Sequence, residues 1–165
     1  MTVYYFFMMP NVLKSITLHE TAPRAFLGTE KDQAIASLRE DSVFQPVNTA
    51  IPGPYDLHLS IQDGRLVMEM AGADGTPLPA LVLSVKPYTR LIRDYFMLIE
   101  SYETLRKAGT ACQLEPVDMA RRGLHNEGAA LLMERLAGKI ALDHPTARRL
   151  FTLICALHGQ HFPAF

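Results

Sequence analysis

The clearest hydrophobic pattern in the chain is an alternation on both sides of an Asp-Gly pair, in YDLHLSIQDGRLVMEMA, residues 55–71. A period of two is typical of a β-strand with one buried face, and Asp63–Gly64 suits a two-residue turn that needs positive φ angles. The pattern therefore predicts a β-hairpin, followed by a third antiparallel strand in LPALVLSV, residues 78–85. The expected cross-strand pairs of the hairpin are Gln62–Arg65, Ile61–Leu66, Ser60–Val67, Leu59–Met68, His58–Glu69 and Leu57–Met70.

The N-terminal part of the chain predicts one more strand and one helix. Residues Asn11–Glu20 alternate, with Val12, Lys14, Ile16 and Leu18 on one face, and we expect this strand to extend the sheet. The next segment, TEKDQAIASLREDSVF, predicts a helix near Lys31–Leu38 with Thr29 as its N-cap. Its buried stripe would comprise Ala34, Ile35, Leu38 and Val43. Three prolines and a glycine in residues 45–55 predict a loop.

Hydrophobic residues recur at steps of three and four after Pro87, which predicts helices for the rest of the chain. A long helix is expected in residues 88–109, with Gly109 as its stop. In DMARRGLHNEGAALLMERLAGK, residues 118–139, we predict a short helix from Pro116 that breaks at Gly123 and a second from about Glu127 to Ala137. A final helix is expected in residues 143–159, with Asp143 as its N-cap.

Together these elements predict an α+β fold, in which an antiparallel three- to four-stranded meander packs against the long helix and the C-terminal helices. Residues 11–159 would form one globular domain and residues 160–165 a tail. Residues 1–10 would be an edge segment of the sheet, or an N-terminal extension of a chain whose true start is Met8 or Met9. The apolar run Val3–Met9 is too short to span a bilayer, and it lacks the charged start and the cleavage site of a secretory signal.

Composition narrows the class of protein and of partner. With 48% hydrophobic and 20% charged residues, the 165-residue chain can bury a core. A net charge of −1 argues against non-specific nucleic-acid binding, and no segment is long enough to span a membrane. Two widely spaced cysteines, Cys112 and Cys155, are expected to be reduced thiols, which favours a cytoplasmic location.

The densest group of chemically active residues is ARRGLHNEG, residues 120–128. Arg121 and Arg122 could bind a carboxylate or phosphate through paired hydrogen bonds, and the free N–H groups of a helix that begins near Asn126 would favour the same anion. His125 is then a candidate proton-transfer group, with Glu127 to orient it.

Ordinary helix architecture accounts for most of the same residues. Gly123 would stop one helix, Asn126 would cap the next, and Glu127 would be an acid in its first turn. Asp118 and Arg122 are four residues apart and can pair on the helix surface. This interpretation leaves the second arginine and the histidine unexplained.

A second arginine pair, Arg148 and Arg149, begins the last helix, and it could converge with the first pair on one anionic ligand or lie on a solvated face. A metal site at Cys155, His158 and His161 would lack a fourth ligand, so we expect no metal, and no cofactor is indicated. A helix-turn-helix for DNA is disfavoured because the second helix carries mostly alanine, leucine and acidic residues.

Four segments of the chain together carry a resemblance to a known family. They are GPYDLHLSIQDGRLVMEM, DYFMLIESYETLR, DMARRGLHNEGAALLMERLAGKI and TARRLFTLICALH, in this order. They resemble a family of small uncharacterised bacterial proteins of the alphaproteobacterial kind, from about Val12 to His158. The resemblance implies a single cytosolic domain with no assigned reaction, and no catalytic residue is carried over from it.

Two hypotheses for function follow from the sequence. The first, which the sequence favours, is a non-catalytic domain that binds a partner protein or forms a homo-oligomer. Its basis is the apolar content, the Met-rich strand and the aromatic N-terminus. The second is a small-molecule module or enzyme that binds an anion through Arg121, Arg122, Arg148 or Arg149, with His125 nearby. A shared pocket for these residues would favour the second hypothesis.

Overall fold

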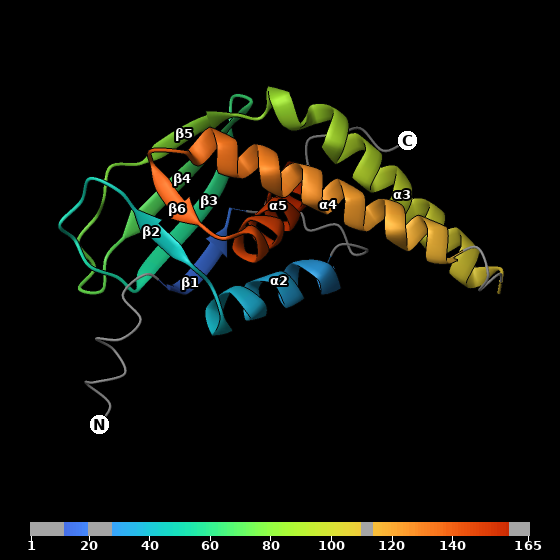
Figure 1. Ribbon diagram of the computed structural model, residues 1–165, viewed down its shortest axis with the longest axis horizontal. Helices are drawn as coiled ribbons and strands as arrows, with labels where there is room; N and C mark the ends of the chain where they lie inside the picture. Colours follow the sequence, from blue (N-terminus) through green and yellow to red (C-terminus); the bar gives the residue numbers. More distant parts are fainter. Residues whose placement is uncertain (1–11, 20–27, 110–113, 159–165) are drawn as a thin grey trace.

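A mixed four-stranded sheet forms one side of the protein in the computed structural model, which describes residues 12–19, 28–109 and 114–158 (Figure 1). The strand order is β1 (Leu13–Leu18), β3 (Tyr55–Gln62), β4 (Arg65–Ala71) and β5 (Leu81–Ser84). The last three strands form the predicted antiparallel meander, and β1 pairs with β3 in parallel. A parallel pair needs a crossover connection, which here contains helix α2. The predicted α+β fold is confirmed, with β1 added in parallel.

The predicted hairpin register is confirmed along its full length. Gln62 lies opposite Arg65 and Leu57 lies opposite Met70, with the intervening pairs as expected. Asp63 and Gly64 have φ angles of 52° and 71°, as a two-residue turn of this type requires. The face of the hairpin that carries Leu57, Leu59, Leu66, Met68 and Met70 is buried.

Strand β1 departs from the predicted alternation at its start. Leu13 and Ile16 are both buried, because the register of the β1–β3 pair shifts between Leu13 and Ser15. Val43, predicted to belong to the helical stripe, lies beyond the end of α2 and is half-buried.

The described residues contain four α-helices: α2 (Gly28–Glu40), α3 (Thr89–Lys107), α4 (Leu114–Leu136) and α5 (His144–His158). The short 3-10 helix η2 (Lys86–Tyr88) leads into α3. Figure 1 shows α3 and α4 as a long pair that runs past the sheet. Every residue from Leu150 to Leu157 of α5 is buried, which makes α5 the central helix of the fold.

A second, two-stranded sheet was not predicted. In it β2 (Phe44–Pro46) pairs antiparallel with β6 (Ile140–Leu142), so part of the predicted loop of residues 45–55 is a strand. Strands of three residues are too short for a hydrophobic period to reveal them. The pairing ties the segment after α2 to the segment between α4 and α5.

Predicted helix ends agree with the structure at several positions. The Asp143 carboxylate accepts a hydrogen bond from the backbone N–H of Thr146 at 3.0 Å, which confirms the N-cap of α5. Gly109 and Gly138 follow α3 and α4 with φ angles of 72° and 78°, a conformation that favours glycine. Helix α2 begins at Gly28, so Thr29 lies in its first turn and does not cap it. Gly159 lies outside the described residues.

The predicted break at Gly123 is wrong, because α4 is one continuous helix of 23 residues. A single glycine weakens a helix by only about 1 kcal/mol relative to alanine, and tertiary packing easily offsets that. The packing here comes from the buried residues Ala129, Leu132 and Leu136. Asn126 and Glu127 are therefore mid-helix and exposed, and the predicted helix start near Asn126 does not exist.

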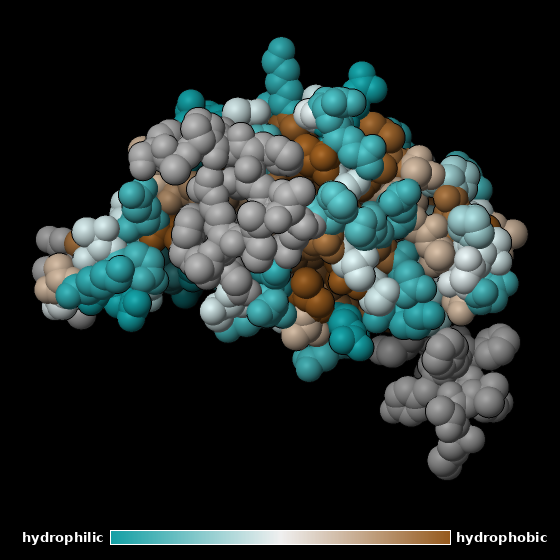
Figure 2. Space-filling view, turned by 180° about the vertical axis from the view of Figure 1, so that it is seen from behind, coloured by the Kyte–Doolittle hydropathy of each residue, from teal (hydrophilic) through white to brown (hydrophobic). Residues whose placement is uncertain are grey.

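Polar side chains cover much of the molecule seen from behind, and hydrophobic ones show between them near its centre (Figure 2). Among the described residues, no helix is both long enough and apolar enough to cross a bilayer. The predicted extension of residues 1–10, the tail of residues 160–165, Cys112 and His161 lie outside the described residues.

Candidate functional site

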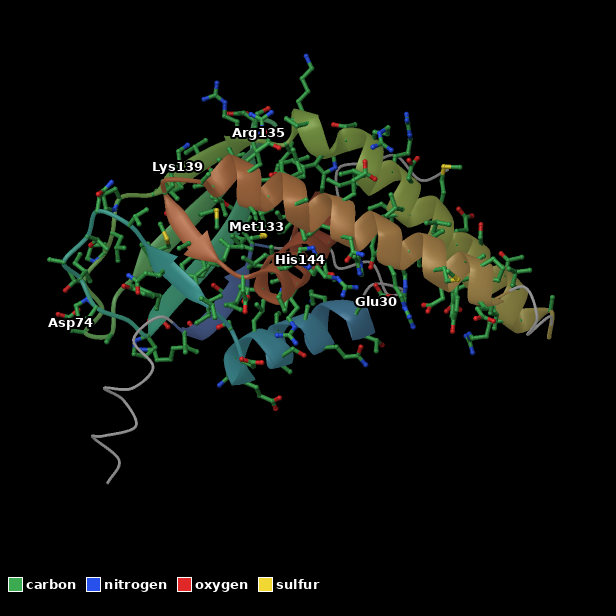
Figure 3. All side chains as sticks on the ribbon, in the orientation of Figure 1. Glu30, Asp74, Met133, Arg135, Lys139 and His144 are labelled. Carbon is green, nitrogen blue, oxygen red and sulfur yellow. The ribbon has the colours of Figure 1, made fainter. Side chains whose placement is uncertain are left out.

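Helices α2, α4 and α5 surround a pocket of about 330 Å³ that brings together four of the six candidate site residues. Figure 3 labels Glu30 and His144, which mark the first turns of α2 and α5 beside this region. Each helix contributes side chains one turn apart. The lining residues are Glu30, Gln33, Ala34 and Ser37 from α2, Arg121 and His125 from α4, and Pro145, Arg148, Arg149 and Thr152 from α5.

Arg121 is the one arginine of the pocket that carboxylates neutralise. Its guanidinium contacts Glu30 at 2.5 Å and Asp118 at 2.9 Å. The other oxygen of the Glu30 carboxylate accepts a hydrogen bond from the Tyr95 hydroxyl. Burial, reinforced by the charge of Glu30, raises the pKa of Tyr95, so its proton stays in this hydrogen bond. The network joins α2, α3 and α4 and closes one end of the pocket.

Arg148 and Arg149 have no carboxylate partner within the described part of the chain. The Nε atom of Arg148 is buried with no hydrogen-bond partner, and none of the ion pairs among the described residues includes Arg148. Arg149 donates to the backbone carbonyl of Asp41 at 2.8 Å, and no ion pair among the described residues includes Arg149. Three arginines and one glutamate line the pocket, so it carries two positive charges in excess.

His125 is held between two aromatic rings. Its ring centroid lies 5.0 Å from that of Tyr95 and 6.2 Å from that of Phe151, and its Nε2 is buried without a hydrogen-bond partner. Burial, helped by the charges of Arg148 and Arg121, lowers the pKa of His125 to about 4. The imidazole is therefore neutral at neutral pH, and it can offer one hydrogen bond to a ligand without adding charge.

Two predicted site residues lie elsewhere. Arg122 pairs with Asp118 at 3.0 Å, as the helix-surface interpretation expected, and its side chain is 69% exposed. Glu127 pairs with Arg90 of α3 at 2.7 Å. The proposed role of Glu127 as the group that orients His125 has no contact to support it, because the two side chains point to different neighbours.

Sequence analysis missed the contribution of α2. Glu30, Gln33 and Ser37 give no signal of a site in the sequence, because polar residues on a helix surface are ordinary. Arg121 lies 91 positions from Glu30 in the chain, and no local pattern links them.

The remaining candidate chemistry does not form a site. Cys155 is fully buried in α5, and burial raises the pKa of its thiol. In the described part of the chain, no three His, Cys, Asp or Glu side chains are arranged to hold a metal ion.

Comparison with known proteins identifies relatives along nearly the whole chain. The sequence model of an uncharacterised protein family, UPF0262, matches residues 11–160. A UPF0262 protein of Mesorhizobium japonicum is 47% identical over 150 residues, which cover 90% of this chain and 93% of the relative. One from Sphingopyxis alaskensis is 52% identical over 132 residues, or 78% of this chain and 80% of the relative. No solved structure matches significantly.

Proposed function

This chain belongs to the uncharacterised UPF0262 family, and we propose that it binds a small anionic molecule in the pocket between α2, α4 and α5. The observation that carries the proposal is the uncompensated pair Arg148 and Arg149, with the Nε of Arg148 buried and unpartnered. The Nε2 of His125 is a second buried atom without a partner in the same pocket. A bound anion would compensate the charges of both arginines.

The energetics favour this assignment over a structural role for the arginines. A partly buried charge without a counter-charge destabilises the folded protein, whereas arginines that only stabilise a fold are paired. Proteins retain such destabilising groups mostly at functional sites. A carboxylate or phosphate would neutralise the excess charge and accept hydrogen bonds from both guanidinium groups.

Binding is the proposed role, and catalysis is not part of it. Among the described residues, His125 has no carboxylate partner that would orient it as a general base. We assign His125 the role of a neutral hydrogen-bonding group beside the anion. A cytoplasmic location belongs to the same proposal, and the free thiol of Cys155 supports it.

Replacement of Arg148 tests the proposal, because two effects of opposite sign are expected. Without ligand, Arg148→Gln should raise the free energy of unfolding by about 1 kcal/mol, since it removes an unpaired charge. The same variant should lose the rise in melting temperature that a bound anion produces, and its affinity should fall more than about tenfold. The measurement is thermal unfolding with phosphate, sulfate, succinate and citrate at constant ionic strength.

Arg122→Gln is the matched control, because it removes an arginine charge from α4 outside the pocket. It should keep the anion response of the unmodified protein. If no anion raises the melting temperature, or if both variants lose the response equally, the proposed function is wrong.

A second candidate is self-association through the groove between α3 and α4. The groove is lined by Met97, Leu98, Ala120, Gly123 and Leu124, with Asp94 and Glu127 also in its lining, and Met97 is 57% exposed. At Gly123 no atom lies within 4 Å of the position a Cβ would take, so a helix from a second copy could approach the backbone closely. The Met-rich strand no longer supports an interface, since Met68 and Met70 are buried.

The oligomeric state tests this second candidate. If the groove is a dimer interface, Met97→Glu should convert a dimer to a monomer, because a charge would be buried against apolar side chains. Light scattering coupled to size-exclusion chromatography measures the mass directly. Val82→Glu, on β5, is the control, because Val82 is exposed and lies outside the groove. A monomeric unmodified protein would refute the candidate.

A further inference from the structure

The charge of the α2–α4–α5 pocket discriminates between anions. Its three arginines and one glutamate leave two positive charges in excess, and His125 is neutral. A dianion would neutralise the pocket, whereas a monocarboxylate would leave one buried charge uncompensated. A phosphate monoester carries close to two negative charges at neutral pH.

The free donors also suit a phosphoryl group. The guanidinium of Arg148 lines the pocket and belongs to no ion pair among the described residues, and Arg149 retains donors beyond the Nη1 that binds the Asp41 carbonyl. Two guanidinium groups offer more donors than the two oxygens of one carboxylate can accept from in their plane, whereas a phosphoryl group presents three terminal oxygens to them.

The remaining lining residues indicate which chemical groups the ligand carries besides its phosphate. Gln33, Ser37 and Thr152 place one amide and two hydroxyl groups around the pocket. Among the described lining residues, His125 has the only aromatic ring, and that ring already packs against Tyr95 and Phe151. A nucleotide base therefore has no aromatic side chain on which to stack. A volume of about 330 Å³ is near the small end of ligand pockets.

We infer that the ligand is a small hydroxylated phosphate monoester, of the polyol-phosphate or sugar-phosphate class. The phosphate binds Arg148 and Arg149, and the hydroxyl groups contact Gln33, Ser37 and Thr152. This inference rests on the proposed anion-binding function and specifies its ligand.

Calorimetric titration of the full chain tests the inference, with glycerol 3-phosphate and glucose 6-phosphate compared with inorganic phosphate, succinate and AMP. We expect at least one of the two hydroxylated esters to bind more than about tenfold tighter than succinate and AMP. The double substitution Gln33→Ala with Ser37→Ala should weaken binding of that ester several-fold and leave inorganic phosphate unchanged. This unchanged affinity also shows that the variant is folded.

The possible results distinguish an error in the ligand class from an error in the proposed anion-binding function. If succinate or AMP binds tightest, or if the α2 substitutions change nothing, the ligand class is wrong, while an Arg148-dependent anion response still supports the proposed function. If none of these anions binds, both are wrong. Cosedimentation with phosphatidylcholine vesicles that contain phosphatidic acid distinguishes the source: binding that requires Arg148 would support the monoester class and place it in a lipid headgroup.

Discussion

Gly128→Ala is expected to lower the free energy of unfolding by about 2 kcal/mol, a large effect for a single methyl group. A Cβ at this position would lie 2.5 Å from Cδ2 of Phe151 and 2.6 Å from two further ring atoms. Phe151 is fully buried at the centre of α5, so its ring has no open space into which it can move. The clash outweighs the gain in helix propensity, which is about 1 kcal/mol.

Gly123→Ala is the matched control on the same helix, and its expected effect has the opposite sign. No atom lies within 4 Å of the Cβ position there, so the helix-propensity gain of up to about 1 kcal/mol should remain. Urea denaturation of both variants measures the two changes. Equal effects of the two substitutions would contradict the close packing of α4 against α5.

The second large effect concerns pH and His125. Its pKa is about 4 in the folded protein, whereas the ordinary value is 6.5. The unfolded chain therefore binds a proton at His125 below about pH 6.5, and the folded protein binds it only near pH 4. The contribution to stability is fully present above pH 6.5 and is lost as the pH falls toward 4. We expect a loss of about 3 kcal/mol from this residue over that window.

His125→Gln isolates this contribution, because glutamine does not titrate. The variant will also lose ring contacts with Tyr95 and Phe151, so the comparison uses the slope of stability against pH. Between pH 7 and pH 4 the unmodified protein should lose about 3 kcal/mol more of its free energy of unfolding than the variant does. Identical slopes for the unmodified protein and His125→Gln would show that His125 is not buried in its neutral form.

Local patterns in the sequence were reliable where a few neighbouring residues decide the structure. The Asp63–Gly64 hairpin, its register, the Asp143 cap and the stop at Gly109 all follow from the conformational preferences of single residues and from the period of the strand. The predicted break at Gly123 is wrong, although it too rests on the preference of a single residue. The low helix propensity of glycine is a weak effect, and the packing of α4 on its neighbours outweighs it.

Some residues of the candidate site could likewise be predicted from the sequence, and others could not. Residue type alone indicates Arg121, His125, Arg148 and Arg149 as candidates, but it does not show whether they meet. Glu30, Gln33 and Ser37 are not predictable from the sequence, because nothing near them in the chain indicates that α2 lies across from α4. Residue type also indicates Arg122 and Glu127, although their side chains leave α4 in other directions.

The sequence by itself determined the α+β class, the hairpin and the residue types from which an anion site could be built, because these depend on periodicity and local geometry. Only the tertiary structure decided which arginines share a pocket and which are neutralised. Whether a charge is compensated depends on distances between segments remote in the chain: Arg121 meets Glu30, whereas Arg148 meets no carboxylate among the described residues. That difference is the physical basis of the proposed function.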